Sequence, residues 1–211
     1  MSTQSSYYNA AKRVLDLAVA FCLFVVFLPF WVVVPILIKL DSKGPVIYRH
    51  KRIGVNGKPF FMYKFRSMVD GAHDLLHNGS SPLLQEFKAK DWKLEHDPRI
   101  TKVGKILRSL TIDEFPQLLN VIRGEMSMVG PRAYMKTELD EQTKRYPQTK
   151  PLLSTILSVK PGITGPWQVS GRNEIPFVKR AELDAHYAQS ATISQDILIL
   201  FKTPVAMLSK W

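Results

Sequence analysis

The chain has 211 residues, of which 29 are Lys or Arg and 18 are Asp or Glu, giving a net charge of +11. This excess indicates nucleic acid, anionic lipid or a phosphorylated substrate as the partner. Its single cysteine, Cys22, excludes a disulfide framework and a thiolate metal site. Outside one apolar run, about 170 residues remain, enough for one soluble domain with its own core.

Residues 17–38 form an uncharged run made mostly of Leu, Ile, Val and Phe, with Pro29 near its middle. As one helix, at about 1.5 Å per residue, it would be about 33 Å long and could span a bilayer. It is too long for a signal peptide, and no small-residue cleavage site follows it. Basic residues lie on both sides of it, at Lys12 and Arg13 before and at Lys39, Lys43, Arg49, Lys51 and Arg52 after.

Two arrangements fit this run. Composition alone favours a single kinked span, because prolines are tolerated in spanning helices. The positive charge at both ends instead places both ends in the cytoplasm. Pro29 has no N–H and its ring clashes with the preceding turn, so it predicts a bend that lets a re-entrant helix return.

A β-hairpin is predicted next, with strands at residues 45–50 and 60–65 and a Gly/Asn turn at residues 54–57. The polar stretch 68–92 is weakly helical, and its two histidines, His73 and His77, are interpreted as solvent-facing. A turn at residues 97–99 then precedes the basic segment 102–108.

The candidate catalytic residues are the adjacent carboxylates Asp113 and Glu114. They precede a helical pattern that ends near Gly124. Thr111 with Glu114 fits a capping box, whereas Asp113 as N-cap keeps Pro116 in the first turn, and the second register is preferred. Alone, the pair is ordinary helix-start chemistry. Carboxylates at such a place can also hold Mg²⁺ against a diphosphate.

Arginines near this pair favour the functional interpretation. Arg108 lies five residues upstream, Arg132 follows Gly130 and Pro131, and Arg172 ends a glycine-rich loop at residues 161–172. A guanidinium binds two phosphate oxygens at once, so these arginines suit a phosphorylated substrate.

Six short motifs in chain order give a close resemblance to a known family. They are KRVLD at 12–16, KGPV at 43–46, YKFRSM at 63–68, DEFPQL at 113–118, GEMSMVGPR at 124–132 and PGITGPWQVSGR at 161–172. Together they resemble the bacterial sugar transferases, the monotopic phosphoglycosyl transferases that start exopolysaccharide and O-antigen assembly. The resemblance extends from about residue 12 to about residue 201 and is to the minimal form of the family.

The resemblance implies a two-step reaction at the bacterial inner membrane. Asp113 would attack the β-phosphorus of a UDP-sugar, expel UMP and form an aspartyl phosphosugar, which polyprenol phosphate would then take up. Glu114 would assist with Mg²⁺ or with protons, the metal being held by Asp113 and Glu114. The basic residues around the substrate phosphates would be Lys64, Arg66, Arg108, Arg132 and Arg172. Gln168 would also bind the substrate.

Other features of the family bear on the lipid, the sugar and one loop. The apolar segment would be re-entrant with both ends cytoplasmic, on anionic lipids. Residues 78–99 and Trp167 resemble the hexose-transferring branch, which favours glucose or galactose. Ala133 replaces a common proline, which puts the rigidity of the Arg132 loop in question. The oligomeric state is left open.

The predicted fold is α+β. Residues 1–42 form the re-entrant membrane helix broken at Pro29, residues 43–192 a mostly helical cytoplasmic catalytic domain with a small β-hairpin, and residues 193–211 a C-terminal amphipathic segment. That segment either lies in the membrane interface, anchored by Trp211, or packs on the domain.

Two rival functions remain open. One is a membrane-tethered nucleic-acid-binding module, for which the chain has no recognisable motif, so that no nucleic acid is expected. The other is a Mg²⁺-dependent phosphohydrolase that uses water in place of the lipid.

Overall fold

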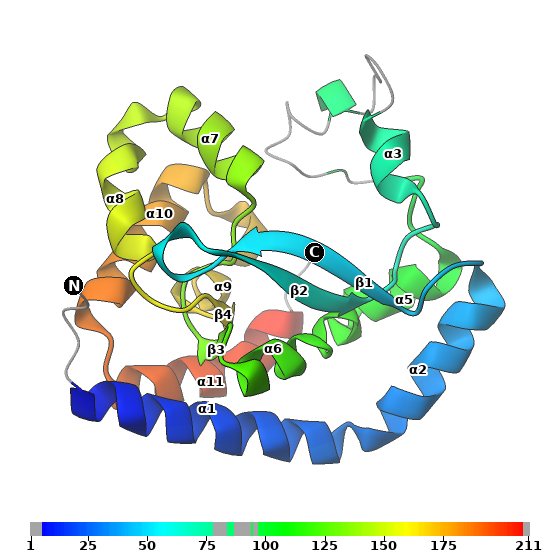
Figure 1. The fold of residues 1–211 in the computed structure, drawn as a ribbon, viewed down its shortest axis with the longest axis horizontal. Coiled ribbons are helices and arrows are strands. Elements are labelled where there is room, and N and C mark those ends of the chain that lie inside the picture. The colour runs from blue at the N-terminus through cyan, green and yellow to red at the C-terminus, as the bar shows by residue number, and fades with distance from the viewer. Residues whose placement is uncertain (1–5, 78–83, 87–93, 95–96, 209–211) are drawn as a thin grey trace.

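The computed structural model describes residues 6–77, 84–86, 94 and 97–208 (Figure 1). Most of the stretch at 78–99, from which a hexose was predicted, and the expected anchor Trp211 lie outside the described residues. The helices are α1 (Ser6–Val26), α2 (Leu28–Asp41), α3 (Ala72–His77), α5 (Lys102–Ser109), α6 (Gln117–Arg123), α7 (Lys136–Arg145), α8 (Lys150–Ile156), α9 (Pro166–Val169), α10 (Phe177–Ser190) and α11 (Ile193–Leu208). The strands are β1 (Ile47–Ile53), β2 (Pro59–Phe65), β3 (Ser127–Val129) and β4 (Gly162–Thr164), so the mixed α+β class is confirmed.

The apolar run forms two helices, α1 and α2, bent by 62°. The break lies at Phe27, two residues before Pro29, because Pro29 occupies the first turn of α2, where its missing N–H costs no hydrogen bond. Pro35 lies inside α2 without ending it. Among the described residues no single helix is long and apolar enough to span a membrane, and only this bent pair meets the length and composition criteria together.

Both helices bury one side and expose apolar side chains on the other. α1 runs along α6, β3 and α11 at the base of the view in Figure 1, and α2 rises beside α5. Ala20, Val34 and Ile38 are fully buried in these contacts. The exposed apolar side chains include Phe21, Val25, Val26, Val32, Val33, Ile36 and Leu40. The domain therefore does not cover the apolar run.

Strands β1 and β2 form the predicted antiparallel hairpin, with Ile47 opposite Phe65 and Ile53 opposite Pro59. β1 continues to Ile53, beyond the expected end at residue 50. Asn56 and Gly57 both have positive φ angles, and the Lys58 N–H donates to the Val55 carbonyl, as in a type I′ turn. This turn matches the twist of the strands and therefore fixes the register.

A second sheet, which the sequence did not indicate, pairs β3 with β4 in parallel. It brings the Gly130 loop against the glycine-rich loop at 161–172. A Cβ at Gly162 would lie 2.1 Å from the Gly130 nitrogen, and one at Gly165 would lie 2.0 Å from the Gly130 oxygen. These glycines are needed because two backbones touch there.

Both predicted registers for the start of the helix after Asp113 are wrong. Residues Ile112–Glu114 form a 3₁₀ turn, Thr111 has φ 58°, and α6 begins only after Pro116. Asp113 has no free N–H to cap, because Phe115 N–H donates to the Ile112 carbonyl and Pro116 has none. The C-terminal prediction is confirmed, since Gly124 ends α6 with φ 79°.

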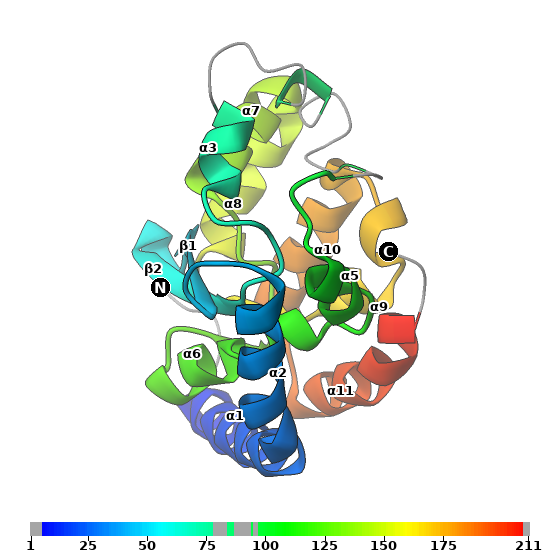
Figure 2. The same cartoon turned by 90° about the vertical axis from the view of Figure 1, so that its right-hand side faces the viewer.

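The C-terminal helix α11 packs against α9, β3, β4 and α1 (Figure 2). Ile199 is buried in this contact, whereas Phe201 and Val205 are 78% and 73% exposed. One of the two expectations for this segment, packing on the domain, is therefore observed for one face. The interfacial placement of the other face stays a prediction.

Candidate active site

Asp113 is, with Asp184, one of the two acids among the described residues that have a buried oxygen without a hydrogen-bond partner. It lies in the 3₁₀ turn between α5 and α6, its side chain is nearly fully buried, and its Oδ1 atom has no hydrogen-bond partner. Burial raises the pKa of Asp113 to about 6, the neighbouring charge of Glu114 adds to the rise, and Lys64 and Arg108 oppose it. The ionised carboxylate is thus held in an environment that stabilises it poorly.

Glu114 has the opposite electrostatic balance. Lys64, on β2, places its Nζ 2.6 Å from Glu114 Oε1. Burial by itself would raise the pKa of Glu114, but the charge and hydrogen bond of Lys64, together with Arg132 and Arg172, lower it below the usual value. Two adjacent carboxylates with pKa values moved in opposite directions are typical of sites that divide chemical roles between acids.

Three arginines complete the charge around this pair. Arg108 comes from the last turn of α5, Arg132 from the loop after β3, and Arg172 from the end of the glycine-rich loop. The charge of Arg108 lowers the pKa of Asp113, and the charges of Arg132 and Arg172 lower the pKa of Glu114. The structure therefore brings four of the six predicted substrate-binding residues near the carboxylates: Lys64, Arg108, Arg132 and Arg172.

Arg66 does not join them. Its guanidinium donates to the carbonyls of Pro45 and Ser42, at 2.7 Å and 2.6 Å, and to that of Ile38 at 3.3 Å. Arg66 therefore fixes the chain where α2 ends and the hairpin begins.

Gln168 also makes a local contact. Its amide Nε2 donates to the Ile163 carbonyl at 3.3 Å, while its Oε1 is buried without a hydrogen-bond partner. Arg172 has a further role, because its Nη1 donates to the Ala206 carbonyl at 3.0 Å and so ties the glycine-rich loop to α11.

Behind Arg132 lies a buried polar network that the sequence did not reveal. Its members are Arg52 on β1, Tyr134 after β3, Glu138 on α7, and Arg180 and Asp184 on α10. Asp184 Oδ2 accepts from the Arg132 N–H and the Tyr134 hydroxyl, each at 3.0 Å. The sequence does not distinguish these residues from ordinary polar surface residues, because no motif or spacing marks them.

The network also holds the loop in which Ala133 replaces the family's usual proline. Arg52 Nη1 donates to the Ala133 carbonyl at 3.0 Å, and Asp184 holds the preceding amide. The Arg132 loop is thus restrained from both sides by buried side chains.

The residues present suit a magnesium ion bound together with a substrate. No group of three or more acids, histidines or cysteines among the described residues could hold a metal alone. Mg²⁺, however, commonly uses only one or two carboxylates plus substrate phosphates. Asp113 and Glu114 are hard oxygen ligands, and the unpartnered Oδ1 of Asp113 is free to serve as one.

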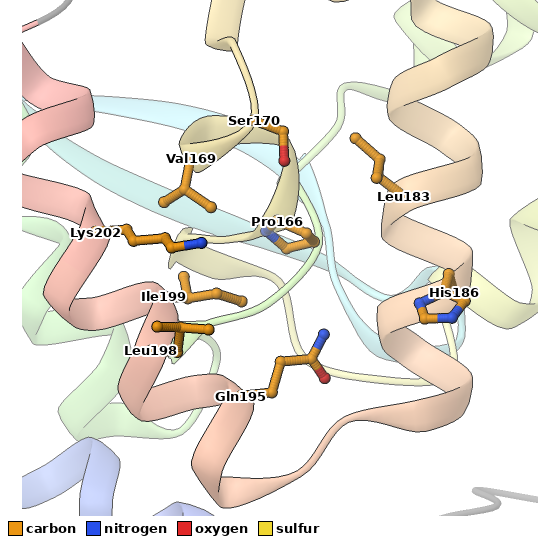
Figure 3. Close-up of a pocket in the computed structure, with 9 residues that line it drawn as sticks. All are labelled: Pro166, Val169, Ser170, Leu183, His186, Gln195, Leu198, Ile199 and Lys202. Atoms are coloured by element: carbon orange, nitrogen blue, oxygen red, sulfur yellow. The ribbon is translucent and has the colours of Figure 1, made fainter.

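A separate cavity of about 230 Å³ lies between α9, α10 and α11 (Figure 3). Leu183 and His186 face it from α10, and Gln195 and Lys202 from α11. None of the predicted site residues lines it. The carboxylate cluster is therefore not part of this cavity.

Comparison with known proteins identifies the family of the chain. The family model of the bacterial sugar transferases matches residues 7–210, so the chain belongs to the bacterial sugar transferase family and is an enzyme of that class.

Three relatives illustrate the family. The exopolysaccharide production protein ExoY of Sinorhizobium fredii is 39% identical over 95% of this chain and 87% of its own length. Undecaprenyl-phosphate galactose phosphotransferase of Salmonella typhimurium is 39% identical over 94% of this chain and 40% of its own length. Undecaprenyl-phosphate glucose phosphotransferase of Komagataeibacter xylinus is 37% identical over 91% of this chain. The chain spans 35% of that enzyme's length, so it corresponds to only part of the two phosphotransferases.

Proposed function

We propose that this enzyme moves a sugar 1-phosphate from a UDP-sugar to polyprenol phosphate through a covalent intermediate on Asp113. The observation that carries the proposal is the buried Asp113 carboxylate, with one oxygen lacking a hydrogen bond, next to Glu114. Lys64 and Arg108 act electrostatically on Asp113, and Lys64, Arg132 and Arg172 act on Glu114. A poorly stabilised carboxylate is a better nucleophile, and the cations offset the charge of a diphosphate.

In the first step an Asp113 oxygen bonds to the β-phosphorus, and the bond from that phosphorus to the bridging oxygen breaks. UMP leaves with the electron pair. In the second step a phosphate oxygen of polyprenol phosphate bonds to the same phosphorus, and the Asp113 carboxylate leaves unchanged. Lys64 keeps Glu114 ionised and in place, and the arginines orient the phosphates. Mg²⁺, bound by Asp113 and Glu114, would neutralise phosphate charge.

The relatives named for undecaprenyl-phosphate, galactose and glucose support undecaprenyl phosphate as acceptor and one of these two hexoses as the sugar. The exposed apolar faces of α1 and α2 support a re-entrant placement at the cytoplasmic face of the bacterial inner membrane, on anionic lipids. Such tethering brings both reactants to one surface.

Asp113→Asn tests the nucleophile. We expect transfer to be lost, by at least about 10³-fold, because an amide cannot form the acyl phosphate. The measurement is UMP release with UDP-galactose or UDP-glucose and undecaprenyl phosphate, with circular dichroism to check folding. Asp140→Asn, an exposed acid paired with Lys136, is the matched control and should retain full activity. Substantial turnover by Asp113→Asn would exclude the covalent mechanism.

Intact mass spectrometry of the wild-type enzyme with UDP-sugar and no acceptor provides a second measurement, since the mass should rise by one phosphosugar. A phosphohydrolase would instead release UMP at full rate without polyprenol phosphate. That outcome would contradict the proposed transfer and favour hydrolysis.

A further inference from the structure

One buried carboxylate, that of Glu138 on α7, lies among three guanidinium groups. Its Oε2 is 3.7 Å from Arg52 Nη1, and its Oε1 is 3.8 Å from both Arg132 Nε and Arg180 Nη1. Glu138, Arg52 and Arg180 are each less than 10% exposed. Glu138 is thus the shared counter-ion of three arginines from three different elements.

The positive charge of this group is not fully neutralised. Three guanidiniums surround Glu138, and Asp184, the other nearby acid, is partly protonated near neutrality because burial raises its pKa to about 7. The Nε atoms of all three arginines are buried without a hydrogen-bond partner among the described residues. Burial lowers the pKa of Arg52 to about 10, and repulsion from Arg132 contributes. An anion bound nearby would relieve this repulsion.

Arg132 is the member of the group that an anion can reach. Its side chain is 33% exposed, against 8% for Arg52 and 6% for Arg180. Its charge also lowers the pKa of Glu114, which places Arg132 within electrostatic range of the carboxylate pair.

Trp167 supports Arg132 from the glycine-rich loop. The guanidiniums of Arg132 and Arg180 each lie 5.1 Å from the centre of its ring. Among the described residues, the Arg132 guanidinium therefore contacts the Trp167 ring and the Glu138 carboxylate. A negative charge is needed to oppose the repulsion from Arg52 and Arg180, and Glu138 is the carboxylate that lies within ion-pair distance of all three guanidiniums.

We propose that Glu138 is a positioning residue, which holds Arg132 in place to bind a phosphate of the nucleotide-sugar donor. The proposal rests on the function given above. Without the carboxylate, the two buried guanidiniums repel Arg132 and displace it from the position in which it binds the donor phosphate. Glu138 itself does not touch the donor, so its effect passes through Arg132.

A double-mutant cycle tests this dependence. The variants are Glu138→Gln, Arg132→Gln and the pair, and the readout is UDP binding by isothermal titration calorimetry in the presence of Mg²⁺. We expect Glu138→Gln to weaken UDP binding about tenfold when Arg132 is present and less than twofold in the Arg132→Gln background. An equal loss in both backgrounds would overturn the proposal, because Glu138 would then act independently of Arg132.

Controls separate positioning from folding and from the reaction itself. Asp140→Asn, on the same helix but exposed, should bind UDP like the wild type. If Glu138→Gln does not fold, Glu138→Met, which also removes the charge at similar size, replaces it in the same cycle with the same two outcomes. UDP binding needs no acceptor, so a wild-type enzyme that binds UDP but transfers nothing would refute the proposed function and leave the cycle interpretable.

Discussion

At the scale of single residues, the site is defined by two adjacent carboxylates in different surroundings. Asp113 is buried with an unpartnered oxygen, and Glu114 is paired with Lys64. The sequence placed both acids, Arg132 and Arg172 because short motifs carry them, and it placed Arg108 because it lies five residues before Asp113. It could not separate Arg66 from these, since a basic residue inside a motif looks the same whether it meets a ligand or a backbone carbonyl.

The raised pKa of Asp113 implies that its ionised carboxylate lowers the stability of the fold. An acid with a folded pKa of about 6, against 3.8 for the unfolded chain, stabilises the fold below pH 4, and that contribution is lost as pH rises through 6. We therefore expect Asp113→Asn to be more stable than the wild type at pH 7.5, by on the order of 2 kcal/mol.

Thermal unfolding in detergent at several pH values measures this difference. The advantage of Asp113→Asn should shrink below pH 4, where the wild-type carboxyl is protonated in both states. A constant difference between pH 3.5 and pH 7.5 would contradict the proposed desolvation of the ionised carboxylate.

At the scale of elements, the bend between α1 and α2 depends on tertiary contacts as well as on Pro29. Phe27 lies against Phe115, with ring centres 4.3 Å apart. Val34 and Ile38 of α2 are buried in a cluster with Phe65 and Leu107. Each such buried side chain contributes about 1.5–3 kcal/mol, which exceeds what straightening the helix would gain.

We therefore expect Pro29→Ala to keep the bend. Spin labels on cysteines at Tyr7 and Leu40, both exposed, with Cys22→Ser, report the distance by pulsed electron paramagnetic resonance in nanodiscs. At 1.5 Å per residue a straight helix would separate these positions by about 50 Å, and the 62° bend reduces this to about 43 Å. A shift of Pro29→Ala toward the longer distance would show that the proline alone sets the bend.

At the scale of the whole molecule, the first and last helices are joined by one buried acid. Asp196 of α11 is fully buried and accepts from the Tyr8 hydroxyl at 3.0 Å, from Lys12 at 2.9 Å and from the Tyr187 hydroxyl. A second buried acid, Asp16 of α1, accepts from the Ser127 hydroxyl and the Met128 N–H. The apolar helix pair is thereby fixed to the catalytic domain.

Asp196→Asn should loosen this junction. Loss of the charge leaves Lys12 without its buried partner, and we expect a loss of about 2–3 kcal/mol, or a fall in Tm of about 5–10 °C. Thermal unfolding of purified protein measures it. Asp140→Asn removes an exposed acid and should change Tm little. Equal melting of wild type and Asp196→Asn would mean that the junction contributes nothing to stability.

By itself the sequence determined the features that local chemistry dictates. The apolar run with a proline, the hairpin with its Asn-Gly turn and the helix end at Gly124 all follow from backbone preferences over a few residues. The tertiary structure decided the rest. The parallel pairing of β3 with β4, the Lys64–Glu114 ion pair and the group around Glu138 each join segments far apart in the chain. The pKa values of the buried acids and arginines there depend on burial and on partners from other elements, and no local sequence pattern encodes either.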